Sequence, residues 1–252
     1  MADHTNADLL ARIEQLEQLL TQQGTHATDA GVADDGAPDD AVSNVDMWFL
    51  LDRSGSMQSI ATDVVGGFDA FFADQRAQPG TATVTFVQFD DQDPHERVFT
   101  AKPIGTVRSI AGRFQPRGCT PLFDAIGLLL DRAERHVARG NHPADQLVVI
   151  FTDGMENASR HWTAQQINTR IAGLRAAGWT FVFLGANQDS YATTRDLAMA
   201  GGSTSNFEAN PAGVAMAYDL LSANVSAYRS KPRRTRVADE ARFWDEAGKP
   251  ED

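Results

Sequence analysis

Residues 45–57 read Val-Asp-Met-Trp-Phe-Leu-Leu-Asp-Arg-Ser-Gly-Ser-Met. The run from Val45 to Leu51 is almost entirely apolar, which is typical of a strand buried on both faces of a parallel sheet. The run ends in Asp52-Arg53-Ser54-Gly55-Ser56, a D-x-S-x-S pattern, and a helical pattern follows. This segment therefore predicts a strand, a polar loop at its carboxyl end and then a helix.

Strand and helix patterns continue to alternate after this segment. Further strands are predicted at 82–89, 97–101, 146–152 and 179–184, and helices at 60–75, 122–137, 163–177, 190–200 and 211–228. The turn 90–96 joins its two flanking strands as an antiparallel hairpin. The alternation predicts an α/β fold, a doubly wound and mostly parallel sheet with helices on both faces.

The two ends of the chain lie outside this alternation. Residues 1–22 carry one apolar helical stripe of Leu9, Ile13, Leu16 and Leu20. Residues 8–20 are therefore a candidate for self-association as a short coiled coil, and the alternative is a helix that docks elsewhere. Residues 23–44 are predicted to be an acidic flexible linker and 45–228 the folded domain. Residues 229–252 are predicted to be a charged, solvated tail.

Composition narrows the classes of function. The formal charge of -12 over 252 residues argues against a general nucleic-acid binder, which needs a basic face. No secretory signal and no apolar run of membrane-spanning length is present, so no membrane association is expected. The single cysteine, Cys119, agrees with a reducing compartment, and we expect a cytoplasmic protein.

Oxygen-bearing side chains follow three of the predicted structural elements. Asp52, Ser54 and Ser56 follow the first strand, Thr120 precedes a helix, and Asp153 follows the strand 146–152. Ligands of doubly wound sheets bind beyond the carboxyl ends of the strands. Two carboxylates and three hydroxyls, with no His or Cys, suit a hard cation such as Mg²⁺ or Mn²⁺. The alternative for the first loop is that its Asp and serines only cap a helix.

The D-x-S-x-S loop, the later Gly-x-Thr-x-Leu at 118–122 and Thr152-Asp153-Gly154 resemble the metal-ion-dependent adhesion site (MIDAS) of von Willebrand factor A (vWA) domains. The resemblance covers about residues 45–228 and implies a six-stranded sheet of order 3-2-1-4-5-6 with an antiparallel edge strand. It implies direct metal contacts from Ser54, Ser56 and Thr120. Asp52 and Asp153 would act partly through water.

The resemblance also implies a function. We expect a non-catalytic module that grips an Asp or Glu of a protein partner through the bound cation, and an AAA+ ATPase or a stress or conflict system is a plausible context. The recognition rim is predicted from loop adjacency to contain Arg53, Met57, Arg117, Glu156 and Asn157. Cys119 is expected to be a small buried filler, and the acidic turn at Asp90, Asp91 and Asp93 to be solvated.

Two other classes of function remain as alternatives. One is a structural scaffold, oligomerised by the N-terminal helix, in which the metal only stabilises the fold. The other is a Mg²⁺-dependent phosphatase, which the sequence disfavours because Ser54 stands where D-x-D phosphatases carry their second carboxylate. G-x-S-x-G and P-loop motifs are not found, so serine hydrolases and P-loop ATPases are disfavoured as well. His161 is expected to face solvent.

Overall fold

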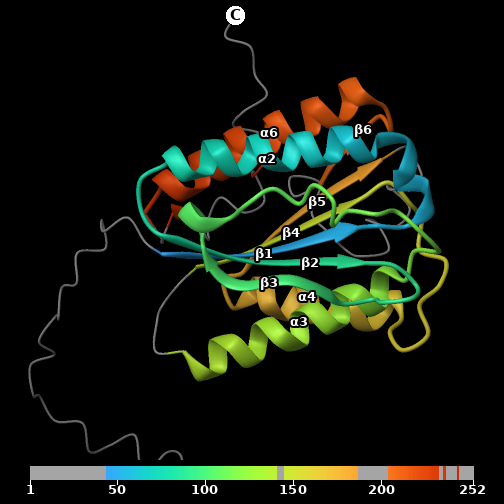
Figure 1. The fold of residues 1–252 in the computed structure, drawn as a ribbon. Coiled ribbons are helices and arrows are strands. Elements are labelled where there is room, and N and C mark those ends of the chain that lie inside the picture. The colour runs from blue at the N-terminus through green and yellow to red at the C-terminus, as the bar shows by residue number, and fades with distance from the viewer. Residues whose placement is uncertain (1–43, 141–144, 187–203, 233–234, 237–242, 244–252) are drawn as a thin grey trace, which may run out of the picture. The chain divides into compact units, whose positions relative to one another are not determined.

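The computed structural model describes residues 44–140, 145–186, 204–232, 235–236 and 243. Its centre is a six-stranded sheet of order β3-β2-β1-β4-β5-β6 (Figure 1). The strands are β1 Val45–Asp52, β2 Ala82–Phe89, β3 Glu96–Pro103, β4 Asp145–Thr152, β5 Thr180–Ala186 and β6 Thr204–Phe207. All neighbours pair in parallel except β2 and β3, which form the antiparallel hairpin at one edge. The predicted fold class and strand order are confirmed.

Helices cover both faces of this sheet. Helices α2 (Ala61–Ala77) and α6 (Pro211–Ser230) lie on one face, and α3 (Leu122–Arg139) and α4 (Ala164–Ala176) lie on the other (Figure 1). A short 3-10 helix, η1 (Gly55–Ile60), precedes α2, and another, η2 (Ile104–Thr106), follows β3. No helix among the described residues is long and apolar enough to cross a bilayer.

The apolar run of β1 feeds two separate cores because successive side chains of a strand point to opposite faces. Met47, Phe49 and Leu51 belong to the cluster under α2 and α6. Trp48 and Leu50 belong to the cluster under α3 and α4. Every residue of β1 after Asp46 is buried. Two-sided burial explains why the sequence of this strand is continuously apolar rather than alternating.

The predicted boundaries of these elements differ from the observed ones by no more than two residues. The resemblance implied a sixth strand, but the sequence pattern does not reveal its residues, because Thr-Ser-Asn-Phe is short and carries only one large apolar residue. The predicted helix at 190–200 and the predictions for residues 1–43 lie outside the described residues.

The prediction of a solvated tail after residue 228 is wrong for three of its residues. Arg229, Arg236 and Phe243 are buried. Arg229 donates to the backbone oxygen of Gln75 at 2.6 Å, and Arg236 pairs with Asp145, the first residue of β4, at 2.6 Å. A cluster of basic residues resembles a solvated tail in sequence, but here two of its guanidiniums lie inside the protein.

Packing between α2 and α6 makes two adjacent glycines respond in opposite ways to the same change. A Cβ on Gly67 would lie 2.1 Å from the ring of Tyr218, whereas a Cβ on Gly66 would meet nothing within 4 Å. We expect Gly67→Ala to destabilise the fold by about 1–3 kcal/mol through overpacking. Gly66→Ala is expected to stabilise it by about 0.5–1 kcal/mol through helix propensity. Chemical denaturation of both variants measures the difference, and equal effects would contradict this packing.

Candidate metal centre

The D-x-S-x-S loop folds back on the carboxylate with which it begins. Asp52, the last residue of β1, accepts a hydrogen bond from the Ser54 backbone at 2.7 Å and from the Thr152 hydroxyl at 2.5 Å. The hydroxyls of Ser54 and Ser56 lie 3.1 Å apart, and Ser56 donates to Asp153 at 2.7 Å. Four of the five predicted ligands therefore form one chain of hydrogen bonds that links the ends of β1 and β4.

Helix capping does not account for these serines. Ser54 occupies the position before η1, but its side chain makes no capping hydrogen bond. Its hydroxyl lies next to Ser56 instead. The capping alternative is therefore not what the structure shows for the first loop.

Hydrogen bonds also join the three loops that carry the proposed ligands. The first loop contains Ser54 and Ser56, the second contains Thr120, and the third contains Asp153. Gly55 donates to the Gly118 carbonyl at 3.0 Å, which ties the first loop to the second. The Thr120 backbone amide donates to the side-chain oxygen of Asn157 at 2.8 Å, and the Asn157 backbone amide donates to the Thr120 carbonyl at 3.1 Å. The second and third loops are thus joined in both directions, and this fixes the position of Thr120.

Gly154 shows where the oxygens of these loops meet. A Cβ built on this residue would lie 2.9 Å from the Thr120 hydroxyl and 3.6 Å from both the Asp52 carboxylate and the Ser56 hydroxyl. Oxygens of the first and second loops thus lie around Gly154, which belongs to the third loop. Because glycine has no side chain, the space between these oxygens stays open. The structure brings together Asp52, Ser54, Ser56, Thr120 and Asp153, as the sequence predicted.

Burial shapes the electrostatics of the cluster. It raises the pKa of Asp52 from 3.8 to about 7, although hydrogen bonds from Thr152 and Ser54 act in the opposite direction. Burial also raises the pKa of Asp153, against the hydrogen bond from Ser56. Both shifts mean that the cluster holds negative charge poorly by itself, so a bound cation would stabilise it.

The residues fit a hard cation by their chemistry. The cluster offers two carboxylates and three hydroxyls, and Ser56 and Asp153 keep it open to solvent. Among the described residues no group of three or more His, Cys, Asp and Glu gathers, so a carboxylate cage or a zinc-type site of nitrogen and sulfur is not formed there. Mg²⁺ commonly binds through only one or two carboxylates and keeps several waters.

Arg53, the second residue of the D-x-S-x-S pattern, supports the loop from inside. Its guanidinium is buried and contacts Asp90 at 2.6 Å, and it also pairs with Glu96. Asp90 accepts a second guanidinium, that of Arg117, at 2.8 Å. Burial tends to raise the pKa of Asp90, but its hydrogen bonds and the two arginines hold that pKa below its usual value. This network anchors the first and second loops to the β2–β3 hairpin.

Several predictions about the surroundings are therefore wrong. Arg53 and Met57 are buried and cannot form part of a recognition rim, because Arg53 faces Asp90 and Met57 packs in the core. Asp90 is buried rather than solvated, and Cys119 is exposed rather than a buried filler. The sequence pattern of a loop predicts which residues lie close to the site, but it does not predict whether each side chain points outward or into the protein.

The other three predicted rim residues lie at the surface or close to it. Arg117 and Asn157 are exposed, and Glu156 is partly buried. The Glu156 carboxylate accepts hydrogen bonds from the backbones of Phe123 and Ser159 at 3.0 Å and 2.7 Å, so it holds its own loop in place. Met155, which the sequence analysis did not single out, is 54% exposed beside Gly154. Its position directly after Thr-Asp-Gly was the available signal.

A second buried carboxylate fixes the wall beside Thr120. Asp124, in the first turn of α3, accepts hydrogen bonds from three successive backbone amides at 2.8–2.9 Å, those of Arg160, His161 and Trp162. These loops line an open cavity of about 520 Å³, whose walls include Asn157 and the two chain neighbours of Thr120, Cys119 and Pro121. His161 is exposed at its edge, as predicted. The cavity is preformed because its walls are held by hydrogen bonds.

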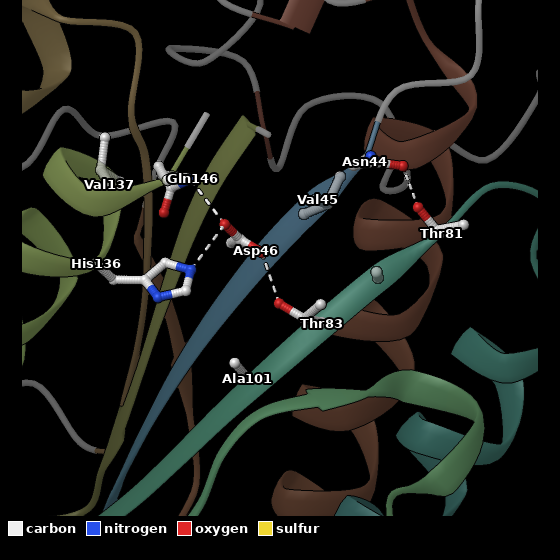
Figure 2. Close-up of a pocket in the computed structure, with 11 residues that line it drawn as sticks. Asn44, Val45, Asp46, Thr81, Thr83, Ala101, His136, Val137 and Gln146 are labelled. Carbon is white, nitrogen blue, oxygen red and sulfur yellow. Dashed lines mark hydrogen bonds and ion pairs between the residues drawn. The ribbon is translucent and has the colours of Figure 1, made fainter. Parts of the chain in front are cut away.

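Another cavity, of about 250 Å³, lies at the amino ends of the strands, away from this cluster (Figure 2). There Asp46 accepts hydrogen bonds from Thr83 at 2.6 Å and Gln146 at 3.2 Å, and His136 lies 3.6 Å from it. These polar groups are paired with one another. The carboxyl-end cluster, with its open oxygens, is therefore the better candidate for a functional site.

The pKa of Asp52 predicts a pH dependence of stability in the metal-free protein. Between pH 3.8 and about 7 the folded chain keeps a proton on Asp52 that the unfolded chain has lost, so this residue's contribution to stability falls as pH rises through that window. From pH 5.5 to 8 the free energy of unfolding should fall by about 2 kcal/mol more in the wild type than in Asp52→Asn. Denaturation in EDTA measures this difference, and parallel pH profiles would contradict it.

Comparison with known proteins identifies the fold family. The family model for the von Willebrand factor type A domain matches residues 46–215. The chain is similar to the pilus adhesin SpaC from Lactobacillus rhamnosus GG (14% identity, TM-score 0.57, 74% of this chain and 31% of that one). It is also similar to the vWF domain of the type V pili tip protein Mfa5 from Porphyromonas gingivalis (12% identity, TM-score 0.54, 75% and 97%).

A third similar structure is proximal thread matrix protein 1 from the mussel byssus, solved with a zinc-occupied MIDAS motif (15% identity, TM-score 0.52, 73% and 46%). A search of the curated proteins found none that matches. The chain spans less than half of the SpaC and mussel proteins, and at these identities the likeness shows the fold alone. The family model, however, matches more than half of the chain, so this protein belongs to the von Willebrand factor type A domain family.

Proposed function

We propose that this protein is a metal-dependent protein-binding module and not an enzyme. The observation that carries the proposal is the convergence at Gly154, where the Thr120 hydroxyl meets the Asp52 carboxylate and the Ser56 hydroxyl. The zinc-occupied MIDAS motif of the mussel protein supports the proposal, because it shows that a chain of this fold can hold a divalent ion. In this protein the cation would be Mg²⁺ or Mn²⁺.

Each residue of the cluster has a proposed role. Ser54, Ser56 and Thr120 would contact the metal directly, and Asp52 and Asp153 would act partly through water. Three of the five donors are neutral, so the ion would remain electron-poor and open to an outside oxygen. An Asp or Glu side chain of the partner would complete its coordination. The bound ion supplies electrostatic attraction, and the chain's own residues hold it in place and orient the partner.

Features beside the cluster suit a protein partner. Met155 offers an exposed apolar contact next to Gly154, and the cavity beside Thr120 offers a recess of about 520 Å³. We propose Arg117 and Asn157 as the exposed polar rim between them. We also propose a cytoplasmic location, which rests on the single cysteine and on the lack of a recognisable secretory signal. An AAA+ ATPase or a stress or conflict system as the partner's context is proposed from the family resemblance.

Thr120→Ala tests the proposal against the scaffold alternative. Thr120 is held to Asn157 through its own backbone amide and carbonyl, so loss of its hydroxyl should leave the metal-free melting temperature unchanged. Calorimetry should show Mg²⁺ or Mn²⁺ uptake by the wild type and a loss of about tenfold or more in Thr120→Ala. A pull-down in Mg²⁺ or in EDTA should recover a partner only with the metal-competent chain. Thr62→Ala, at an exposed position of α2, is the matched control.

The results of these experiments distinguish the binding module from the scaffold and the phosphatase. Unchanged metal uptake in Thr120→Ala would refute the proposed ligand set. Metal uptake that raises stability without any metal-dependent partner would favour the scaffold. Turnover of a generic phosphoester that is lost in Asp52→Asn would favour the phosphatase.

A further inference from the structure

A group of arginines gathers at the sheet edge, between the hairpin strand β3 and helix α3. Arg97 lies on β3 opposite Val87, a residue of the core under α3, so the two positions share that face of the sheet. Arg132 and Arg135 lie three positions apart on α3, a spacing that places them side by side on the helix surface. The Arg132 Nε donates to the Nε2 of His95 at 3.1 Å, which links the helix to the start of β3.

No carboxylate of the described residues forms an ion pair with this group of arginines, in contrast to some of the protein's other arginines. Arg53, Arg170 and Arg236 each form an ion pair with a carboxylate. No ion pair joins Arg97, Arg132 or Arg135 to an acidic residue anywhere in the described parts of the chain. Yet the protein carries 34 acidic residues against 22 basic ones. The positive charge of this group is therefore not neutralised by an ion pair, although the protein as a whole is acidic.

The electrostatics of the group show that the positive charges are not compensated. Burial lowers the pKa of Arg132, and the charges of Arg97 and Arg135 lower it further. Burial, and then the charge of Arg132, lowers the pKa of His95 to about 4, with Asp93 acting in the opposite direction. His95 is thus neutral at physiological pH and acts as the acceptor for Arg132. The like charges repel one another, and an anion would remove this repulsion.

We propose that Arg97, Arg132 and Arg135 form a binding site for a phosphate-type oxyanion. Guanidinium groups present planar pairs of N–H donors that match the oxygens of a phosphate, and several arginines together are the common means of binding one. Arg97 and Arg135 are exposed and accessible to a ligand, while Arg132 is held in place by His95. The site uses none of the proposed metal ligands and does not rest on the proposed function. Its ligand is either free phosphate or a phosphorylated side chain of a partner.

Titration of the full chain with inorganic phosphate tests the proposal. The measurement is made in EDTA, with potassium chloride at matched ionic strength as the reference, so that metal binding and salt screening do not contribute. We expect phosphate to raise the melting temperature of the wild type above that in chloride. Arg135→Gln should weaken phosphate binding by about tenfold, because one charge-assisted pair of hydrogen bonds is lost. Arg108→Gln, an exposed arginine outside the group, should bind phosphate as the wild type does.

A second variant and a second ligand complete the test. Arg97→Gln relieves the repulsion, so it should raise the melting temperature in phosphate-free buffer while abolishing the phosphate-dependent shift. A short phosphoserine peptide that binds more tightly than free phosphate would identify a phosphorylated partner as the source, and the reverse order would identify free phosphate. The proposal is overturned if phosphate acts no differently from chloride, if Arg135→Gln and Arg108→Gln behave alike, or if an unphosphorylated acidic peptide binds equally well.

Discussion

Asp90→Ala is expected to lower the free energy of unfolding by about 3–5 kcal/mol, because it leaves a buried guanidinium without its main counter-charge. Arg53 is buried, and both its Nε and its Nη2 contact the Asp90 carboxylate, at 2.8 Å and 2.6 Å. The other carboxylate oxygen of Asp90 accepts hydrogen bonds from the backbone amides of Gln92 and Asp93, each at 2.8 Å. The substitution therefore removes one group that holds two loops at once.

The proposed metal site should weaken together with the fold. Arg53 stands between Asp52 and Ser54, and its backbone carbonyl accepts the Arg117 amide at 2.8 Å. A displaced Arg53 would therefore shift the loop that carries the proposed ligands, and we expect divalent-metal affinity to fall by about tenfold or more even under conditions where the variant is folded. Chemical denaturation and calorimetry with Mg²⁺ or Mn²⁺ measure the two effects.

Two further variants separate the causes. Asp90→Asn keeps an acceptor for Gln92 and Asp93 but removes the charge, so it should retain the turn and still lose most of the stabilisation of Arg53. Asp219→Ala removes an exposed carboxylate from α6 and should change stability by no more than about 0.5 kcal/mol. If Asp90→Ala costs as little as Asp219→Ala, the ion-pair network does not anchor the loops.

The meeting of the proposed ligands at one edge of the sheet can be predicted from sequence because the signals for it are local. Asp52 and Asp153 follow strands whose continuous apolar character marks them as central. Parallel central strands end at the same edge of a sheet, so residues a hundred positions apart in the chain become neighbours without any knowledge of side-chain contacts. The order of the strands in the sheet cannot be predicted from the hydrophobic pattern alone. It was implied by the resemblance to vWA domains.

Side-chain direction within loops could not be predicted in the same way. Arg53 and Met57 lie in the same loop and helix as Ser54 and Ser56, yet both point inward. Arg53 does so because its partner Asp90 lies in another turn, 37 residues away in the chain, and no local pattern reveals such a pairing. Burial of a charge depends on a distant counter-charge, whereas burial of an apolar strand depends on its own residues.

The same limitation explains the basic residues near the end of the chain, where the second large effect is expected. Arg236 is 1% exposed. Besides its ion pair with Asp145, it donates to the backbone carbonyls of Lys231 at 2.8 Å and Arg229 at 2.7 Å, and it lies over the ring of Tyr228 at 5.1 Å. One side chain therefore fixes the end of α6 against the first residue of β4.

Arg236→Ala should lower the free energy of unfolding by about 3–5 kcal/mol, because it removes the guanidinium from a buried carboxylate and from two carbonyls. For a chain of this size that corresponds to a fall of roughly 10 °C in melting temperature. Arg236→Lys should rescue only part of the loss, since an ammonium has no planar fork with which to reach the carboxylate and both carbonyls. Arg113→Ala, at an exposed position, is the control and should melt close to the wild type. A melting temperature of Arg236→Ala near that of Arg113→Ala would mean that the segment after α6 is the solvated tail that its composition suggests.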